Sequence, residues 1–241
     1  MITITNIHKR FEQQHVLHGI TASFEDGKTN LVIGRSGSGK TVLLRCIVGL
    51  LTPDQGQVLY DGRDMHHLPK NETTLLRQEM GMLFQGAALF DSMNVLDNVL
   101  FPLEMFSSKN RHERLARARF CLDRVGLSNA ETKMPSELSG GMQKRVAIAR
   151  AIALEPRYLF CDEPNSGLDP ISSRLIDSLI SDITHEYGIT TIVNTHDMGS
   201  VRSIGEQILF IHEGSLAWTG NNLLLDNTDN PQLKEFIGSA G

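Results

Sequence analysis

Several features that mark whole classes of protein are scarce in this sequence. Its 241 residues include three cysteines, Cys46, Cys121 and Cys161, which stand apart among apolar neighbours and lack the spacing of metal ligands. We therefore expect reduced, buried thiols in a reducing compartment. Apolar runs fall short of a membrane span, which takes about 18 residues or more. Residues 1–5 alternate like a strand and lack the charged and apolar regions of a signal peptide.

Basic residues are also outnumbered. The chain has 23 lysines and arginines against 28 acidic residues, for a net charge of −5, and it contains no basic tract. This balance argues against a general nucleic-acid-binding surface, so we expect no nucleic acid among the partners. With 40% hydrophobic and 21% charged residues, the composition is that of a globular protein with a sizeable core. We expect a cytoplasmic protein that reaches a membrane through a partner.

The strongest motif is a glycine-rich loop. The pattern G-x-x-x-x-G-K-[ST] is matched by Gly34, Arg35, Ser36, Gly37, Ser38, Gly39, Lys40 and Thr41. An apolar run at 30–33 predicts a buried strand before it, and residues 42–50 predict a helix after it, which is the context that this motif needs. Glycines let backbone N–H groups turn inward around a phosphate chain, and the helix N-terminus adds a favourable dipole. Lys40 can reach the β- and γ-phosphates, and the Thr41 hydroxyl can hold Mg²⁺, so the loop predicts a nucleotide site.

Strands and helices alternate around this loop. Apolar alternation predicts edge strands within residues 1–30, and short apolar runs predict strands at 57–60, 80–85, 158–161, 189–193 and 207–211. Helical periodicity predicts one helix that begins at 94 and others at 111–125, 139–154, 172–186, 198–204 and 231–237. The sequence therefore predicts an α/β fold with a parallel sheet, interrupted by a helical insertion at about 86–156.

A second motif narrows the class. Residues 138–141 read Leu-Ser-Gly-Gly at the start of a predicted helix, and four further segments stand in order along the chain: Gln85 after 82–84, the strand end Asp162-Glu163, the loop 166–169, and His196 after 194–195. Together they resemble the nucleotide-binding subunit of an ATP-binding-cassette (ABC) transporter, over residues 1 to about 220. The resemblance implies a P-loop NTPase of ABC type, with an N-terminal antiparallel β subdomain and the helical insertion within one domain over 1–241. It also implies ATP hydrolysis coupled to transmembrane transport.

The resemblance assigns catalytic roles that the side-chain chemistry supports. Asp162 ends an apolar strand and suits, with Thr41, an Mg²⁺ ion that keeps most of its waters. Glu163 can polarise the attacking water, and His196 can donate a hydrogen bond to the γ-phosphate. Gln85 is assigned to the metal or the water through the resemblance alone. Without that resemblance, an acidic strand end and a lone histidine would have a structural reading.

The same resemblance implies a second half of the site. Ser139, Gly140 and Gly141 open a helix, so their N–H groups can form another anion site. In the family this site faces the nucleotide of a second subunit. The segment 166–169 resembles the family's D-loop, and the resemblance assigns Asp169 to nucleotide binding. The implied assembly is a head-to-tail dimer with two ATP molecules at its interface.

Adenine binding is also assigned by resemblance. Phe11 stands where the family has a stacking aromatic, with Val16 beside it, and a plain core position is the alternative for Phe11. Two departures stand out: Met142 replaces a common glutamine, and Asn165 replaces a common threonine. Neither removes a catalytic group.

One stretch indicates a branch of the family. Residues 85–92 read Gln-Gly-Ala-Ala-Leu-Phe-Asp-Ser, which resembles the Mla/Mkl branch, whose members serve phospholipid transport with MCE-domain partners. This stretch is unusually apolar for a surface loop. It either packs in the core or forms a groove for a helix of an integral membrane permease subunit. The resemblance places the chain on the cytoplasmic face of the inner membrane. An amino-acid importer, a cell-division ATPase and a soluble ABC ATPase remain alternatives, whereas the motif at 138–141 disfavours a small-molecule kinase.

Overall fold

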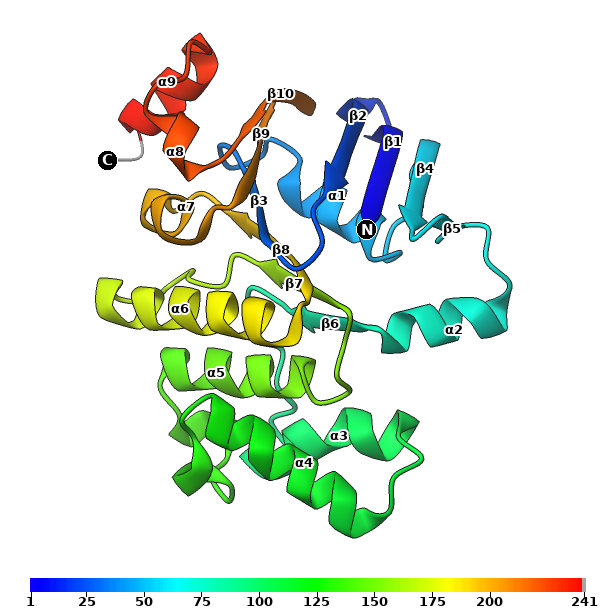
Figure 1. The fold of residues 1–241 in the computed structure, drawn as a ribbon, viewed down its shortest axis with the longest axis vertical. Coiled ribbons are helices and arrows are strands. Elements are labelled where there is room, and N and C mark those ends of the chain that lie inside the picture. The colour runs from blue at the N-terminus through cyan, green and yellow to red at the C-terminus, as the bar shows by residue number, and fades with distance from the viewer. Residues whose placement is uncertain (240–241) are drawn as a thin grey trace.

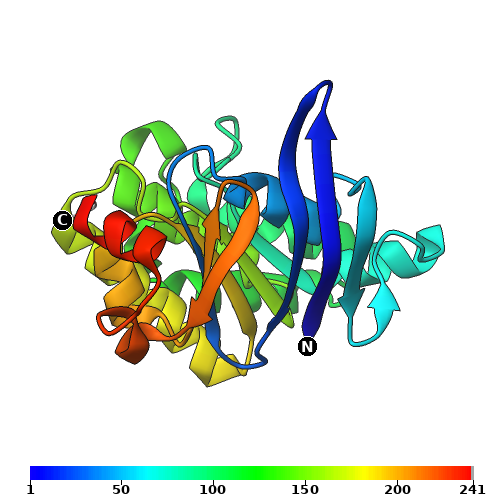
Figure 2. The ribbon, with the colours of Figure 1, turned by 90° about the horizontal axis from the view of Figure 1, so that it is seen from above.

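The computed structural model describes residues 1–239 and arranges their strands in two sheets. The first sheet has four antiparallel strands in the order β2-β1-β4-β5. Their bounds are β1 Ile2–Phe11, β2 Gln14–Phe24, β4 Gln55–Tyr60 and β5 Arg63–Asp64. Figure 2 shows β1 and β2 as a long blue hairpin. Strand β1 lies between β2 and β4, so the prediction that residues 1–30 form only edge strands is wrong for β1.

The second sheet has six strands in the order β10-β9-β3-β8-β7-β6. Neighbours from β9 to β6 run parallel, and β10 pairs antiparallel with β9. The bounds are β3 Thr29–Ile33, β6 Met80–Leu83, β7 Tyr158–Asp162, β8 Thr190–Thr195, β9 Gln207–His212 and β10 Ser215–Gly220. Every residue of β3, β7 and β8 is buried, as expected for parallel strands that are covered on both faces. The predicted parallel α/β sheet is present.

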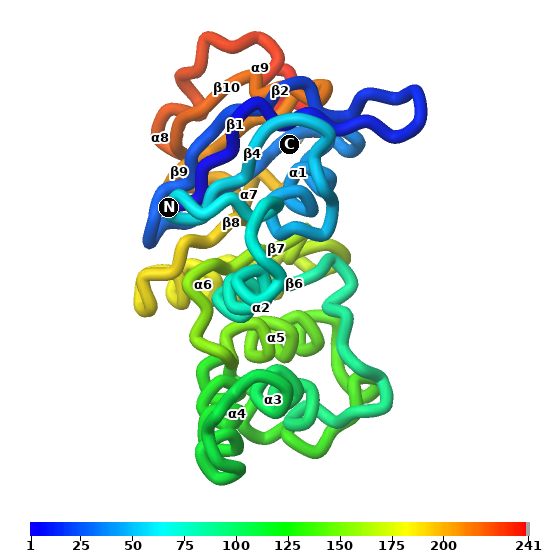
Figure 3. The backbone as a smooth tube through the Cα atoms, turned by 90° about the vertical axis from the view of Figure 1, so that its right-hand side faces the viewer, coloured from blue at the N-terminus to red at the C-terminus, as the bar shows by residue number. Residues whose placement is uncertain are grey.

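The helices lie beside this second sheet or, in the case of α3 and α4, stack beyond α5 (Figure 1). They are α1 Lys40–Ile47, α2 Lys70–Gln78, α3 Val95–Phe106, α4 Arg111–Arg124, α5 Gly140–Ala151, α6 Pro170–Tyr187, α7 Met198–Ile204, α8 Asn222–Leu225 and α9 Pro231–Ser239, with short 3₁₀ turns at Ser128–Ala130 and Pro135–Glu137. Helices α3, α4 and α5 pack on one another, and α5 also contacts β6 and α6. Figure 3 shows α3 and α4 at one end of the molecule and the antiparallel sheet at the other. Among residues 1–239, no helix has both the length and the apolar character that crossing a membrane would take.

The core forms on both faces of the six-stranded sheet. Neighbouring residues of one strand belong to different clusters: Leu31 and Ile33 pack with α3–α7, whereas Val32 packs with α1 and the antiparallel sheet. This alternation follows from the pleat, which points successive side chains to opposite faces. The loops that follow β3, β7 and β8 are therefore held on strands that are covered on both faces.

The element boundaries differ from the predictions in understandable ways. The strand predicted at 80–85 ends at Leu83, because Ala87 and Ala88 adopt positive φ angles and turn the chain away. Helix α6 begins two residues before the predicted 172, since Asp169 caps it and Pro170 occupies the first turn. Helix α2 was missed because Leu76 is its one buried residue, which leaves little apolar periodicity. At the start of the helix predicted from 139, Ser139 caps α5 by accepting a hydrogen bond from the Met142 amide.

Candidate nucleotide-binding site

The glycine-rich loop joins the end of β3 to the start of α1. Gly34, Gly37 and Gly39 all adopt positive φ angles, of 153°, 80° and 102°. A Cβ at Gly34 would lie 2.3 Å from the Ile211 carbonyl oxygen, and one at Gly39 would lie 2.8 Å from Leu17 Cδ2. Side chains at these two positions would clash with the neighbouring strands. The loop can close only because glycine occupies them.

Lys40 lies folded inside this loop. Its ammonium donates hydrogen bonds to the carbonyl oxygens of Gly34 and Arg35, at 2.8 and 3.1 Å, and the residue is 5% exposed. Burial lowers the pKa of the ammonium, and the nearby carboxylates of Glu163 and Asp162 oppose that shift. The Ser38 hydroxyl is buried in the same loop without a hydrogen-bond partner among residues 1–239. The loop thus holds a cation and an unsatisfied donor beside the first turn of α1.

Thr41 and Asp162 meet beside the loop, although 121 positions separate them. The Thr41 hydroxyl donates a hydrogen bond to Asp162 Oδ1 at 3.2 Å, and Asn194 Nδ2 donates to the same oxygen at 3.2 Å. Sequence reasoning missed Asn194, because its partner Asp162 lies 32 positions away and Asn194 is one of several polar residues in strand β8. Residues 1–239 contain no group of three His, Cys, Asp or Glu side chains that could hold a metal ion. A metal here would therefore need oxygens from phosphates and water.

Glu163 and His196 follow two adjacent parallel strands, β7 and β8. Glu163 Oε2 lies 2.7 Å from His196 Nδ1, and the Glu163 amide donates to the Asn194 carbonyl at 2.9 Å. Glu163 has a φ of 51°, an uncommon conformation for a residue with a side chain. The Gln85 side chain donates to the Ser166 hydroxyl at 3.3 Å. Gln85, Glu163 and His196 thus come together from three separate segments.

One pocket of about 500 Å³ lies at the carboxyl ends of β3, β7 and β8, and Asp162 stands just outside its lining, bonded to Thr41. Among its lining residues are Val16, Arg35, Ser36, Gly37, Gly39, Lys40, Thr41, Gln85, Glu163 and His196. The carboxyl ends of parallel strands are where ligands bind in open α/β sheets. Both the position of the pocket and its lining residues indicate a phosphate-bearing ligand.

Other predicted site residues lie outside that lining within the described part of the chain. Phe11 ends β1, is 44% exposed, and has the Lys9 ammonium 5.7 Å from its ring centroid. The Asp169 carboxylate caps α6 by accepting from the amides of Ile171 and Ser172, and hydrogen bonds from Ser172 lower its pKa. Ser139–Gly141 open α5, and a Cβ at Gly140 would lie 3.6 Å from Leu168 Cδ2.

Helix α9 supplies pocket residues that the sequence did not indicate. Phe236 and Ser239 line the pocket, and Glu235 pairs with Arg35 of the glycine-rich loop at 2.8 Å. The Phe236 ring lies 5.4 Å from that of Phe210 and is 3% exposed. The sequence predicted a helix at 231–237, but a contact over 200 positions leaves no local signal.

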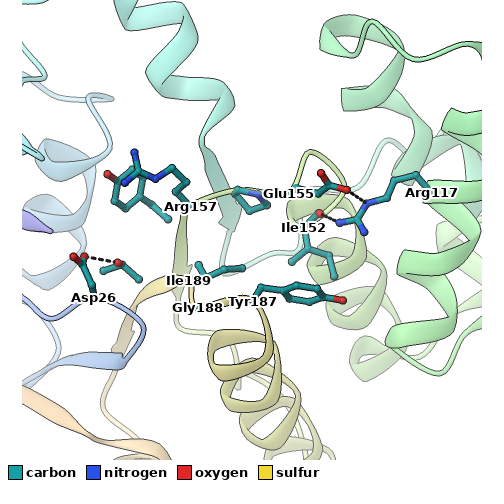
Figure 4. A pocket seen from close by; sticks show the side chains of 11 residues that line it. Asp26, Arg117, Ile152, Glu155, Arg157, Tyr187, Gly188 and Ile189 are labelled. Atoms are coloured by element: carbon teal, nitrogen blue, oxygen red, sulfur yellow. Dashed lines mark hydrogen bonds and ion pairs between the residues drawn. The ribbon is translucent and has the colours of Figure 1, made fainter.

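A larger pocket of about 630 Å³ lies at the other edge of the sheet, where β7 and β8 begin (Figure 4). Its charged side chains have partners within the chain. Arg117 donates to the Ile152 carbonyl oxygen at 2.7 Å, and Arg157 pairs with Asp61 at 2.7 Å. The charges there are already satisfied, so we place the functional site at the glycine-rich loop.

The fold and the pocket at the glycine-rich loop define a P-loop nucleotide-binding protein of the α/β class. The family model described as "ABC transporter" matches residues 17–166. The chain is 31% identical to the ATP-binding cassette MJ0796, solved as a dimer in a post-hydrolysis state bound to ADP and Pi, with a TM-score of 0.83 over 92% of this chain and 99% of that one. The chain belongs to the ABC transporter family, as an ATP-binding subunit of its Mla/Mkl branch.

Curated relatives carry different transport names. The chain is 35% identical to the probable ribonucleotide transport ATP-binding protein mkl of Mycobacterium leprae (strain TN), over 98% of this chain and 68% of that protein. It is 37% identical to the intermembrane phospholipid transport system ATP-binding protein MlaF of Escherichia coli (strain K12), over 92% and 82%. It is 39% identical to the glutamine transport ATP-binding protein GlnQ of the same organism, over 98% of both chains. The matches confirm the predicted ABC fold and family and leave the transported molecule open.

Proposed function

We propose that this chain hydrolyses ATP, as a head-to-tail pair at the cytoplasmic face of the inner membrane, to power phospholipid transport through permease subunits. The observation that carries the ATPase part is the convergence of Lys40, the Thr41–Asp162 pair and the Glu163–His196 pair on one pocket. Phosphate binding, metal binding and water activation each have a suitable group there.

The residues present fit a nucleotide with Mg²⁺. The glycine cradle would be blocked by any Cβ at Gly34, and the buried Ser38 hydroxyl lacks a partner among residues 1–239. Oxygen atoms of Thr41 and Asp162 suit a hard cation that keeps most of its waters, and Gln85 is the further candidate ligand. When bound, Mg²⁺ neutralises charge on the β- and γ-phosphates. Phe11, with Val16 in the pocket lining, is the candidate for contact with adenine.

The hydrolysis step assigns a task to each side chain. Lys40 turns from its two loop carbonyls to the phosphates. His196 breaks its contact with Glu163 and instead donates a hydrogen bond to the γ-phosphate. Glu163 then orients a water in line with the γ-phosphorus. A bond forms from the water oxygen to phosphorus while the bond to the bridging oxygen of ADP breaks and a proton of the water passes to the Glu163 carboxylate, giving ADP and inorganic phosphate. Positioning and electrostatic stabilisation supply most of the rate.

The second half of the site comes from another copy of the chain. Ser139–Gly141 lie outside the lining of their own chain's pocket, within the described residues, and are largely exposed at the start of α5. The first amides of a helix have no acceptor within the helix, so they can bind a phosphate presented by a partner. Asp169 caps the adjacent α6 and accepts a hydrogen bond from the Ser172 hydroxyl, which would lie 3.6 Å from a Cβ at Gly141. The dimeric form of the cassette MJ0796 supports such an assembly.

A groove beside Gln85 is the proposed binding site for a helix of a permease subunit. It has a volume of about 300 Å³ and is lined mainly by apolar side chains, among them Met82, Phe84, Phe90, Phe101 and Leu154. Phe84 and Phe90 are 38% and 40% exposed. Exposed apolar surface of this kind marks an interface, and an amphipathic helix fits a groove.

Phospholipid is the proposed cargo because of the similarity to MlaF and the stretch at 85–92. An amino-acid importer is the second candidate, favoured by the full-length similarity to GlnQ. Copurification from native membranes separates the two. The proposal expects an MCE-domain protein and bound phospholipid, whereas an amino-acid permease without an MCE protein would contradict the lipid role. Recovery without any membrane subunit would indicate an ABC ATPase that acts outside transport.

A further inference from the structure

The loop between β6 and α3 holds two consecutive alanines in a left-handed conformation. Ala87 has a φ of 60° and Ala88 a φ of 49°. Residues with a Cβ rarely adopt this conformation, because the Cβ approaches the following carbonyl oxygen, whereas glycine adopts it freely. Gly86 directly precedes the pair. Non-glycine residues persist in this region only where the surroundings hold them.

Helix α5 supplies the groups that hold this loop. The Arg150 guanidinium donates to the carbonyl oxygens of Ala87 and Ala88, at 2.9 and 2.8 Å. The Lys144 ammonium, on the same helix, donates to the carbonyl oxygen of Gln85. Lys144 is 5% exposed, and burial lowers the pKa of both Arg150 and Lys144. Two cations that have lost much of their hydration are thus directed at three loop carbonyls.

The loop lies between the two surfaces that the proposed function uses. Gln85, at its start, lines the nucleotide pocket and bonds to Ser166. Ala88 and Phe90 line the apolar groove, and Arg150 lines it with them, 5.8 Å from the centroid of the Phe90 ring. Arg150 therefore contacts the groove and the loop backbone at the same time.

We propose that Arg150 is a positioning residue, which holds the left-handed Ala87–Ala88 turn and so sets the position of Gln85 in the nucleotide pocket. Lys144 holds the first residue of the same loop. The planar fork of arginine matches two adjacent carbonyls, which the single ammonium of a lysine cannot do. The kinetic effects expected of this role of Arg150 rest on the ATPase function proposed above.

Kinetics with a backbone rescue test this role. In the full chain, Arg150→Lys should lower kcat for ATP by about tenfold and change KM by less than about threefold, since a misplaced group slows the chemical step more than it weakens binding. Adding Ala88→Gly should recover most of the lost rate, because glycine adopts the turn without the clamp. Ala88→Val in the wild-type chain should reproduce the Arg150→Lys defect, because a β-branched residue resists positive φ. Ala88 is exposed, so neither change alters the core.

Ala116 provides the matched control. It is an exposed alanine inside α4, far along the chain from the loop. Ala116→Gly should give no rescue of Arg150→Lys, and Ala116→Val should leave turnover near wild type. Equal rescue by Ala116→Gly, or no rescue by Ala88→Gly, would overturn the proposal in favour of a plain packing role for Arg150.

Hydrogen exchange tests the clamp without any catalysis. The amides of Ala87, Ala88 and Phe90 donate to Phe84 O, Gly86 O and Asn98 Oδ1, at 2.9, 2.7 and 2.8 Å. Arg150→Lys should speed their exchange in a peptide covering 84–90 by at least about tenfold, with peptides from α4 unchanged. Unchanged exchange at 84–90 would overturn the proposal. If the wild-type chain releases no phosphate from ATP, the proposed ATPase function is wrong. The hydrogen-exchange result still decides whether Arg150 holds the loop.

Discussion

Glu163 Oε2 lies 2.7 Å from His196 Nδ1, so the candidate base and the candidate phosphate sensor are paired with each other. Their strands, β7 and β8, are hydrogen-bonded neighbours, and the Glu163 amide donates to the Asn194 carbonyl on β8. The backbone therefore aims both side chains at the same place. An uncommon φ at a residue with this role is typical of functional sites. In the hydrolysis step that we propose, nucleotide binding separates the pair and so frees Glu163 to orient a water.

Glu163→Gln should keep nucleotide binding and nucleotide-dependent dimerisation but lower phosphate release by at least about 100-fold, because an amide cannot accept the proton of the water. Phosphate release and light scattering with ATP measure the two properties. Glu213→Gln is a suitable control, since Glu213 is exposed and also has a positive φ, of 46°. Wild-type turnover in Glu163→Gln would remove Glu163 from the role of base.

Lys40→Ala should weaken ATP binding by roughly 10- to 100-fold, because the loop loses its charge-assisted hydrogen bonds to phosphate. Titration with a fluorescent ATP analogue measures the change. Lys28→Ala, at a half-exposed lysine paired with Glu25, should bind as the wild type does. Equal affinities for all three chains would show that the nucleotide binds elsewhere.

Sequence reasoning succeeded where the residue type is dictated by backbone geometry or by local chemistry. Gly34 and Gly39 had to be glycine because a Cβ there would clash with neighbouring strands, and the pattern shows this directly. It failed where a contact is long-range. Phe236 reaches the pocket from α9, and Asn194 orients Asp162 from the next strand, yet neither carries a local signal.

The departure at Asn165 gains a structural reason. Its amide donates to Asp177 Oδ1 at 2.8 Å and to the Ser200 hydroxyl at 2.9 Å, which joins the loop after β7 to helices α6 and α7. A threonine has too short a donor to bridge both partners in this way. The sequence showed that Asn165 is unusual, but it did not show that Asn165 donates a hydrogen bond to the buried carboxylate of Asp177.

Asp177 also predicts a dependence of stability on pH. Burial raises its pKa above 3.8, and Asp197 adds repulsion, while hydrogen bonds from Asn165 and Ser200 oppose the shift. Because the folded state holds this proton more tightly than the unfolded state, stability falls as the pH rises through the raised pKa. Asp177→Asn should therefore raise the melting temperature at pH 7 by about 2–4 °C, the shift that about 1 kcal/mol gives in a domain of this size.

That gain should shrink as the pH falls toward the ordinary carboxyl value of 3.8. Thermal melts across this range measure it. Asp182→Asn, at an exposed position of the same helix, should give a small change that does not depend on pH in this way. A lower melting temperature for Asp177→Asn at neutral pH would show that the ionised carboxylate stabilises the fold.

Mixing two inactive variants tests whether the site is shared between copies. Lys40→Ala damages the glycine-rich loop, and Ser139→Arg blocks the start of α5, so each homodimer should be inactive. In a head-to-tail pair, a mixed dimer has one site with both defects and one site with neither. In an equal mixture, half of the dimers are mixed, and each mixed dimer has one intact site of two. The mixture should therefore recover about one quarter of wild-type phosphate release.

Lys40→Ala mixed with Glu163→Gln is the matched control and should stay inactive, because both changes affect the half-site that a single chain supplies. Recovery in both mixtures, or in neither, would mean that Ser139–Gly141 do not complete the partner's site.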